Sequence, residues 1–170
     1  MTRAISIRRL AADDAAAFRA IRLEALERHP EAFQSVHRDE AADPLDRIAE
    51  RLARSTVFGA SRGDGLVGMA GFFVHQGEKV RHKGVLWGMY VQAEARGLGI
   101  GASLVERVIA HARAEVEILG LSVVTENVSA RRLYERLGFV AYGTEPRAMK
   151  QNGIYYDEVL MAKTLSPVSG

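Results

Sequence analysis

The chain has 170 residues, 48% of them apolar, so we expect a single domain over residues 1–170 with its core at about residues 4–165. Its formal net charge of +2 comes from 23 basic and 21 acidic residues that are interspersed, which argues against a nucleic-acid partner. The absence of cysteine excludes disulfides, thiolate-zinc sites and a cysteine nucleophile. Since no apolar run approaches the roughly 20 residues that cross a bilayer, and no signal peptide is seen, we predict a cytoplasmic protein without a membrane partner.

The N-terminal part of the sequence predicts one strand followed by two helices. Residues 5–10 alternate between apolar and polar and form the expected strand. An aspartate at position 13 or 14 can cap a helix, which ends just before Pro30 because the residue preceding a proline disfavours the helical region. Asp43-Pro44 starts a second helix, to about residue 54, with the aspartate as N-cap and the proline as first helical residue.

Strands then dominate until a long helix. The Gly63-Asp64-Gly65 turn predicts a hairpin between strands at residues 56–62 and 66–75, and another strand follows at residues 84–91. From Gly99 the apolar spacing becomes helical, and Gly120 is expected to end that helix. The remaining predicted elements are a strand at residues 121–125, a helix at 129–137 and strands at 139–143 and 155–164.

This order predicts an α+β (mixed α/β) fold with a central mixed, mostly antiparallel sheet flanked by helices. The antiparallel meander comes first. A right-handed crossover through the long helix then makes one parallel strand pair.

The segment Arg96-Gly97-Leu98-Gly99-Ile100-Gly101 lies between a predicted strand and a predicted helix. Unpaired N–H groups at a helix start, together with the helix dipole, favour an anion there. Glycines let the backbone approach phosphate oxygens closely. The alternatives are a tight turn without a ligand and the dinucleotide fingerprint, which Gly97, Gly99 and Ala102 also satisfy, with Glu126 as a ribose-binding acid. About 90 residues precede this turn, which a Rossmann domain does not usually show.

Two motifs in this order resemble those of the GNAT acetyltransferases. The first is Arg96-x-x-Gly99-x-Gly101 after the strand that ends at Val91. The second consists of Asn127, Ala130, Leu133, Tyr134, Gly138 and Phe139. The resemblance extends over about residues 5–165 and implies acetyl-CoA as co-substrate, no metal, an N-acetyltransferase activity and, as in many family members, a homodimer.

The resemblance also implies roles for individual residues. The backbone of Arg96, Gly97, Leu98, Gly99, Ile100 and Gly101 would hold the pyrophosphate of acetyl-CoA. The strand edge at Met89, Tyr90 and Val91 would pair with the pantetheine arm. Asn127 and Tyr134 would line the far wall of the cleft, and Asn127 is equally well interpreted as a helix N-cap.

The implied reaction is direct attack of a primary amine, from a small molecule or peptide, on the thioester in a ternary complex. A main-chain N–H at Val91 or its neighbour would stabilise the oxyanion, and Tyr134 would be the general acid for the CoA thiolate. The sequence does not single out a base. Its candidates are Glu24, His75, His82 and Glu126.

The family usually contacts its acceptor through the loop after the first helix and through the last hairpin. This implies Phe33, Ser35 and Tyr155 as acceptor-binding residues, and Trp87 is a further candidate for the pocket. Two other functions stay open: a non-catalytic acyl-CoA-binding module and an NAD(P)-dependent oxidoreductase.

Overall fold

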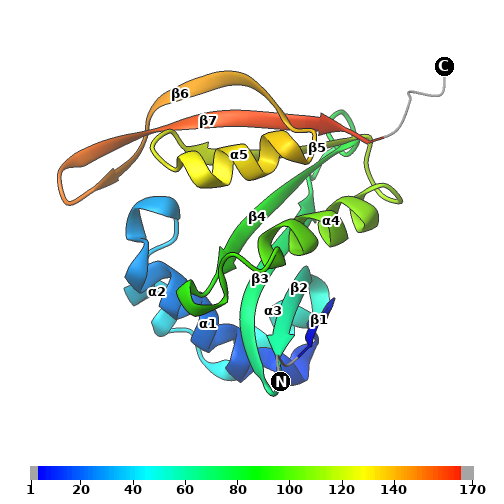
Figure 1. The fold of residues 1–170 in the computed structure, drawn as a ribbon, viewed down its shortest axis with the longest axis vertical. Helices are drawn as coiled ribbons and strands as arrows, with labels where there is room; N and C mark the ends of the chain where they lie inside the picture. The colour runs from blue at the N-terminus through cyan, green and yellow to red at the C-terminus, as the bar shows by residue number, and fades with distance from the viewer. Residues whose placement is uncertain (1–3, 166–170) are drawn as a thin grey trace.

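The computed structural model describes residues 4–165 and contains one mixed sheet of seven strands in the order β1-β2-β3-β4-β5-β7-β6. All pairings are antiparallel except the parallel pair of β4 and β5, which encloses α4 as the predicted crossover does (Figure 1). The strands are β1 (Ile5–Arg9), β2 (Thr56–Arg62), β3 (Gly65–Val74), β4 (Lys83–Val91), β5 (Ile118–Val124), β6 (Val140–Gln151) and β7 (Ile154–Thr164).

Helices cover both faces of the sheet. The α-helices are α1 (Ala15–Arg28), α2 (His37–Ala41), α3 (Leu45–Arg54), α4 (Ile100–Ala112) and α5 (Val128–Arg136). Short 3-10 turns lie at η1 (Ala12–Asp14), η2 (Pro30–Ala32) and η3 (Ala93–Ala95). Within residues 4–165 no helix is long and apolar enough to cross a bilayer.

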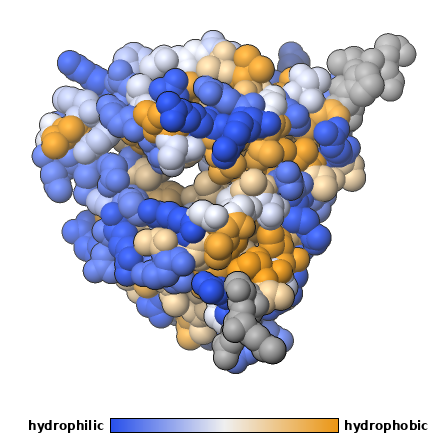
Figure 2. All heavy atoms as spheres, in the orientation of Figure 1, coloured by the Kyte–Doolittle hydropathy of each residue, from blue (hydrophilic) through white to orange (hydrophobic). Residues whose placement is uncertain are grey.

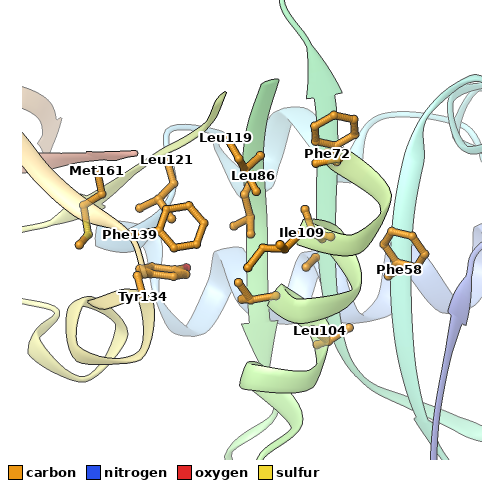
Figure 3. Packing of buried hydrophobic residues seen from close by; sticks show 14 of the residues in the cluster. Phe58, Phe72, Leu86, Leu104, Ile109, Leu119, Leu121, Tyr134, Phe139 and Met161 are labelled. Atoms are coloured by element: carbon orange, nitrogen blue, oxygen red, sulfur yellow. The ribbon is translucent and has the colours of Figure 1, made fainter. Parts of the chain in front are cut away.

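The core consists of two clusters, one on each face of the sheet. The larger cluster packs α4 and α5 against the strands, and Figure 3 shows side chains from both sides of this contact. The apolar residues of α4 that face the sheet are all buried, as the helical spacing predicts: Ile100, Leu104, Val105, Val108, Ile109 and Ala112. The second cluster joins α1 and α3 to the opposite face and includes Phe18, Met69 and Tyr90.

Several elements differ from the predictions. The strand β5 begins at Ile118 rather than at residue 121, and α2 was not predicted. The helix α4 ends at Ala112 rather than near Gly120, which lies inside β5 and pairs with Val85 and Ala162. The strand β6 continues to Gln151 because its hairpin turn is at residues 152–153. Pro44 is itself the N-cap of α3, so that helix begins one residue later than expected.

Candidate active site

The two middle strands of the sheet separate beyond a short stretch. Among residues 4–165, β4 and β5 pair only from Lys83 to Val85 with residues 118–120. Beyond Val85, β4 continues to pair with β3, and β5 continues to pair with β7. From Leu86 to Val91, one edge of β4 therefore has no strand partner. An exposed strand edge of this kind offers main-chain N–H and C=O groups to an extended ligand.

A β-bulge redirects the end of β4. Trp87 pairs with Gly71 and Tyr90 pairs with Met69, so β4 has one more residue than β3 between these pairs. Gly88 lies in this bulge with φ of +64°, a conformation that residues with a side chain rarely adopt. The bulge changes which residues face α4: Leu86 does so before it, and Met89 and Val91 do so after it.

The predicted phosphate-binding turn connects η3 to α4. Gly97 and Gly99 have φ of +78° and +72°, and an added Cβ at either position would meet no atom within 4 Å. A Cβ added at Gly101, by contrast, would lie 3.3 Å from Leu133 of α5. The glycine at this position therefore allows α4 and α5 to pack closely. In the described chain, the N–H groups of residues 97–102 make no backbone hydrogen bond. They lie at the N-terminus of a 13-residue helix, where unpaired N–H groups can bind an anion.

Arg96 lies at the start of this turn and holds it against the end of β4. Its Nε donates to the carbonyl of Val91 at 3.1 Å, and its Nη2 lies 3.2 Å from Nε2 of His29. His29 also stands 3.6 Å from a carboxylate oxygen of Glu31. The residue before Pro30 is therefore more than a helix stop, because its ring reaches the turn.

These features surround a cleft of about 810 Å³, and Figure 2 shows a hollow in the middle of this face of the molecule. Its near wall consists of the end of β4 and the turn, and its far wall consists of β5, α5 and β7. The segment after α1 covers one side. The lining residues are His29, Glu31, Ala32, Phe33, Met89, Tyr90, Val91, Ala95, Arg96, Gly97, Gly99, Ile100, Gly101, Ala102, Val124, Glu126, Asn127, Ser129, Ala130, Leu133, Arg136 and Tyr156.

Five predicted site residues are outside this lining. Leu98 is exposed on the turn, and Ser35 is exposed in the loop before α2. Trp87 faces α1, where the guanidinium of Arg22 lies 5.7 Å from its ring. Tyr155 is exposed on β7, with two cations over its ring, and its neighbour Tyr156 lines the cleft instead.

The fifth is Tyr134, which is buried in α5 beside the cleft-lining residue Leu133. Its ring packs against Phe139 at 5.8 Å between centroids, and Figure 3 shows its hydroxyl directed toward the side of β4 and α4. Burial raises the pKa of its phenol above the ordinary value. Asn127 caps α5, because its side-chain oxygen accepts from the N–H of Ala130 at 3.3 Å, and it also lines the cleft.

Of the four candidate bases, Glu126 alone lines the cleft. Glu24 accepts a hydrogen bond from Tyr90 and another from Gln92, both at 2.8 Å. Burial and then this contact raise the pKa of Tyr90 to about 12. The two histidines flank Lys83 at the opposite end of β4, about 26 Å along the strand from Val91.

Comparison with known proteins agrees with this geometry. The profile of the Acetyltransferase (GNAT) family matches residues 18–139, well over half of the chain. The chain belongs to the GNAT acetyltransferase family. The family agrees with the predicted co-substrate, acetyl-CoA. The oxidoreductase alternative fails on the fold, since a dinucleotide-binding sheet is mostly parallel and here only one strand pair is.

Solved GNAT structures superpose over nearly the whole chain. A GNAT-family acetyltransferase from Streptococcus pneumoniae has a TM-score of 0.86 at 24% identity and covers 96% of this chain and 100% of its own. The protein yncA from Salmonella typhimurium, solved with its cofactor acetyl-CoA, has a TM-score of 0.85 at 24% identity, with 98% and 97% covered. These likenesses establish the fold.

Curated relatives are similar over shorter stretches and have different acceptors in their names. A 5-NmdU N-acetyltransferase of Pseudomonas phage PaMx11 is 43% identical over 67 residues, which is 39% of this chain and 46% of that protein. A mycothiol acetyltransferase of Streptomyces scabiei is 34% identical over 135 residues, 78% of this chain and 42% of its own length. This GNAT chain thus spans less than half the length of each.

Proposed function

We propose that this protein transfers the acetyl group of acetyl-CoA to a primary amine of a small molecule or peptide, by direct attack in a ternary complex. The observation that carries the proposal is the free edge of β4, which ends in a turn whose N–H groups lack acceptors. One continuous stretch of backbone thus offers hydrogen bonds to an extended arm and then to an anion.

The residues present fit acetyl-CoA. The open space at Gly97 and Gly99 admits the pyrophosphate close to the N–H groups of residues 97–102. The side chain of Arg96 adds a positive charge at the same place. Along the edge from Met89 to Val91, alternate residues direct N–H and C=O groups toward the pantetheine arm. When bound, acetyl-CoA supplies an electrophilic thioester.

Main-chain and side-chain groups around the thioester have distinct tasks. A main-chain N–H on the free edge between Met89 and Val91 stabilises the negative charge that develops on the carbonyl oxygen. Tyr134 gives its proton to the departing sulfur. A phenol is already protonated at neutral pH, as a proton donor must be, and burial raises the pKa of Tyr134 further above its ordinary value.

The amine must lose a proton, and the group that accepts this proton is the least obvious part of the mechanism. A lysine-like amine costs roughly 4–5 kcal/mol to neutralise at pH 7, and an α-amine costs about 1 kcal/mol. Glu24 is already occupied by two hydrogen bonds, and the two histidine candidates are too distant. This leaves Glu126, which lines the cleft, or water as the acceptor of that proton.

Thermal unfolding with acetyl-CoA, CoA or NAD tests donor binding. A ligand at 100 times its dissociation constant adds about 2.7 kcal/mol to the stability, which raises the midpoint by about 5–11 °C for a chain of this size. We expect this rise with both CoA species and none with NAD. No rise with CoA would refute the assignment of residues 96–101.

Thiol release across a panel of amines then tests transfer. Tyr134→Phe keeps the ring against Phe139 and should lower kcat by about 10²- to 10⁴-fold. Tyr142→Phe is the matched control, because its side chain is exposed on β6 and away from the cleft. If CoA binds and no amine accelerates thiol release, the protein is the non-catalytic acyl-CoA-binding module.

A further inference from the structure

Only two charged side chains are buried among residues 4–165, and they differ in their partners. Arg22, 6% exposed, pairs with Glu40 through three hydrogen bonds of 2.9–3.2 Å. Glu158 of β7, 4% exposed, has no Lys, Arg or His nitrogen within 4 Å in the described chain. Within the described chain its carboxylate accepts a hydrogen bond from the amide of Gln34 at a long 3.4 Å.

This arrangement is unfavourable for the protein alone. A buried carboxylate loses its hydration, and an amide at 3.4 Å returns little of it, since good N–H···O bonds are 2.7–3.2 Å long. Buried charges are normally paired or hydrogen-bonded. Glu158 therefore lacks, within the described chain, the cationic partner that a buried carboxylate normally has.

The position of Glu158 connects it to the cleft. It is the cross-strand neighbour of Val124, and it lies two residues from Tyr156, so the three side chains share one face of the sheet. Both neighbours line the cleft. On the other side, Gln34 follows the cleft-lining residue Phe33, and η2 packs against β5 and β6. Glu158 thus lies next to two residues of the far wall, at the place where the segment after α1 approaches β5 and β6.

We propose that Glu158 receives the positively charged ammonium of the acetyl acceptor, so that the acceptor is an amine that is cationic at neutral pH. This inference rests on the proposed function and names the group that recognises its acceptor. Three N–H donors of an ammonium suit a carboxylate beside the phenol of Tyr156.

The test compares Glu158→Gln with Glu106→Gln. Glu106 is the control, because it loses the same charge but is exposed on α4 and does not line the cleft. The two acceptor probes are n-propylamine, charged at neutral pH, and O-ethylhydroxylamine, which has the same length and is neutral. In Glu158→Gln we expect the KM for n-propylamine to rise about 10- to 100-fold and that for O-ethylhydroxylamine to stay within about threefold. Glu106→Gln should change neither KM.

Two measurements on the protein without turnover complete the test. The unliganded Glu158→Gln protein should unfold at the same temperature as the wild type or higher, because an unpaired buried charge is removed. A fall of several degrees with unchanged discrimination between the probes would make Glu158 a structural partner of Gln34 and overturn the proposal.

Binding of n-propylammonium chloride to the CoA-loaded protein separates the two proposals. If the wild type releases no thiol with either probe, the proposed transfer is refuted. If n-propylammonium then still raises the unfolding midpoint of the wild type and not that of Glu158→Gln, the ammonium site is supported independently of transfer. If this probe raises both midpoints equally or neither, the ammonium site is refuted whatever the activity.

Discussion

The substitution Glu40→Gln should destabilise the protein by weakening the buried pair with Arg22. The guanidinium of Arg22 is held between the rings of Phe33 and Trp87, at 5.3 and 5.7 Å, and its Nη1 has no hydrogen-bond partner in the described chain. Its charge is therefore balanced by Glu40 alone. Removing one member of a buried pair costs about 3–5 kcal/mol, and glutamine retains one acceptor oxygen, so we expect about 2–3 kcal/mol.

The assay is thermal unfolding at neutral pH. A loss of about 2–3 kcal/mol lowers the midpoint by about 4–12 °C in a chain of this size. Asp39→Asn on the same helix is the matched control, since the Asp39–Arg38 pair is largely exposed and worth about 0–1 kcal/mol. Equal midpoints for the two variants would refute the reasoning, because they would mean that desolvation cancels the attraction in the Arg22–Glu40 pair.

The difference in stability between the wild type and Glu40→Gln should depend on pH in a defined direction. Burial alone would raise the pKa of Glu40, but hydrogen bonds and the charge of Arg22 outweigh it and hold the pKa below the ordinary 4.5. A depressed carboxyl pKa contributes stability above the unfolded value, and this contribution is lost as the pH falls through the folded value. The difference in the free energy of unfolding between the wild type and Glu40→Gln should therefore be largest above about pH 5 and should decrease at lower pH.

Three further substitutions test other contacts by thermal unfolding. Asn127→Ala removes the cap of α5 and should cost about 1 kcal/mol, whereas no loss would mean that the cap contributes nothing. Tyr90→Phe removes the hydroxyl that donates to Glu24 and should cost about 1.5–3 kcal/mol. Because the raised pKa of about 12 gives stability that is present below pH 10 and lost as the pH rises through 12, that cost should shrink in alkali. Gly88→Ala forces a side chain into φ of +64° and should cost about 1–2 kcal/mol, with Gly65→Ala, where a Cβ meets nothing, as control.

The fold could be predicted largely because its signals are local. The two-residue turn before Gly65, the helical spacing of α4 and the crossover to a parallel strand all depend on neighbouring residues. The predicted end of α4 was wrong, because Gly120, which was expected to end the helix, lies inside β5. The length of β6 was missed because both faces of this edge strand are exposed, so that its sequence has no alternation of apolar and polar residues.

The candidate site divides in the same way. The glycines of the turn and the end of β4 are close in sequence, and the predicted residues there, except Leu98, line one cleft. The acceptor side brings together Gln34 and Glu158, which are 124 positions apart. No local pattern marks either residue, and whether Tyr155 or Tyr156 faces the cleft depends on a register that the β6–β7 hairpin fixes in three dimensions.

The bulge in β4 gives the cleft a fixed depth. Val91 lies three positions after Gly88, a span of about 10 Å along the strand. Any extended molecule anchored at the turn must follow this edge, and beyond the bulge the strand turns the bulky indole of Trp87 toward α1. The strand therefore sets a fixed distance between the turn and Gly88. For a ligand bound at the turn, its extended length would decide which of its atoms lies between the two walls of the cleft.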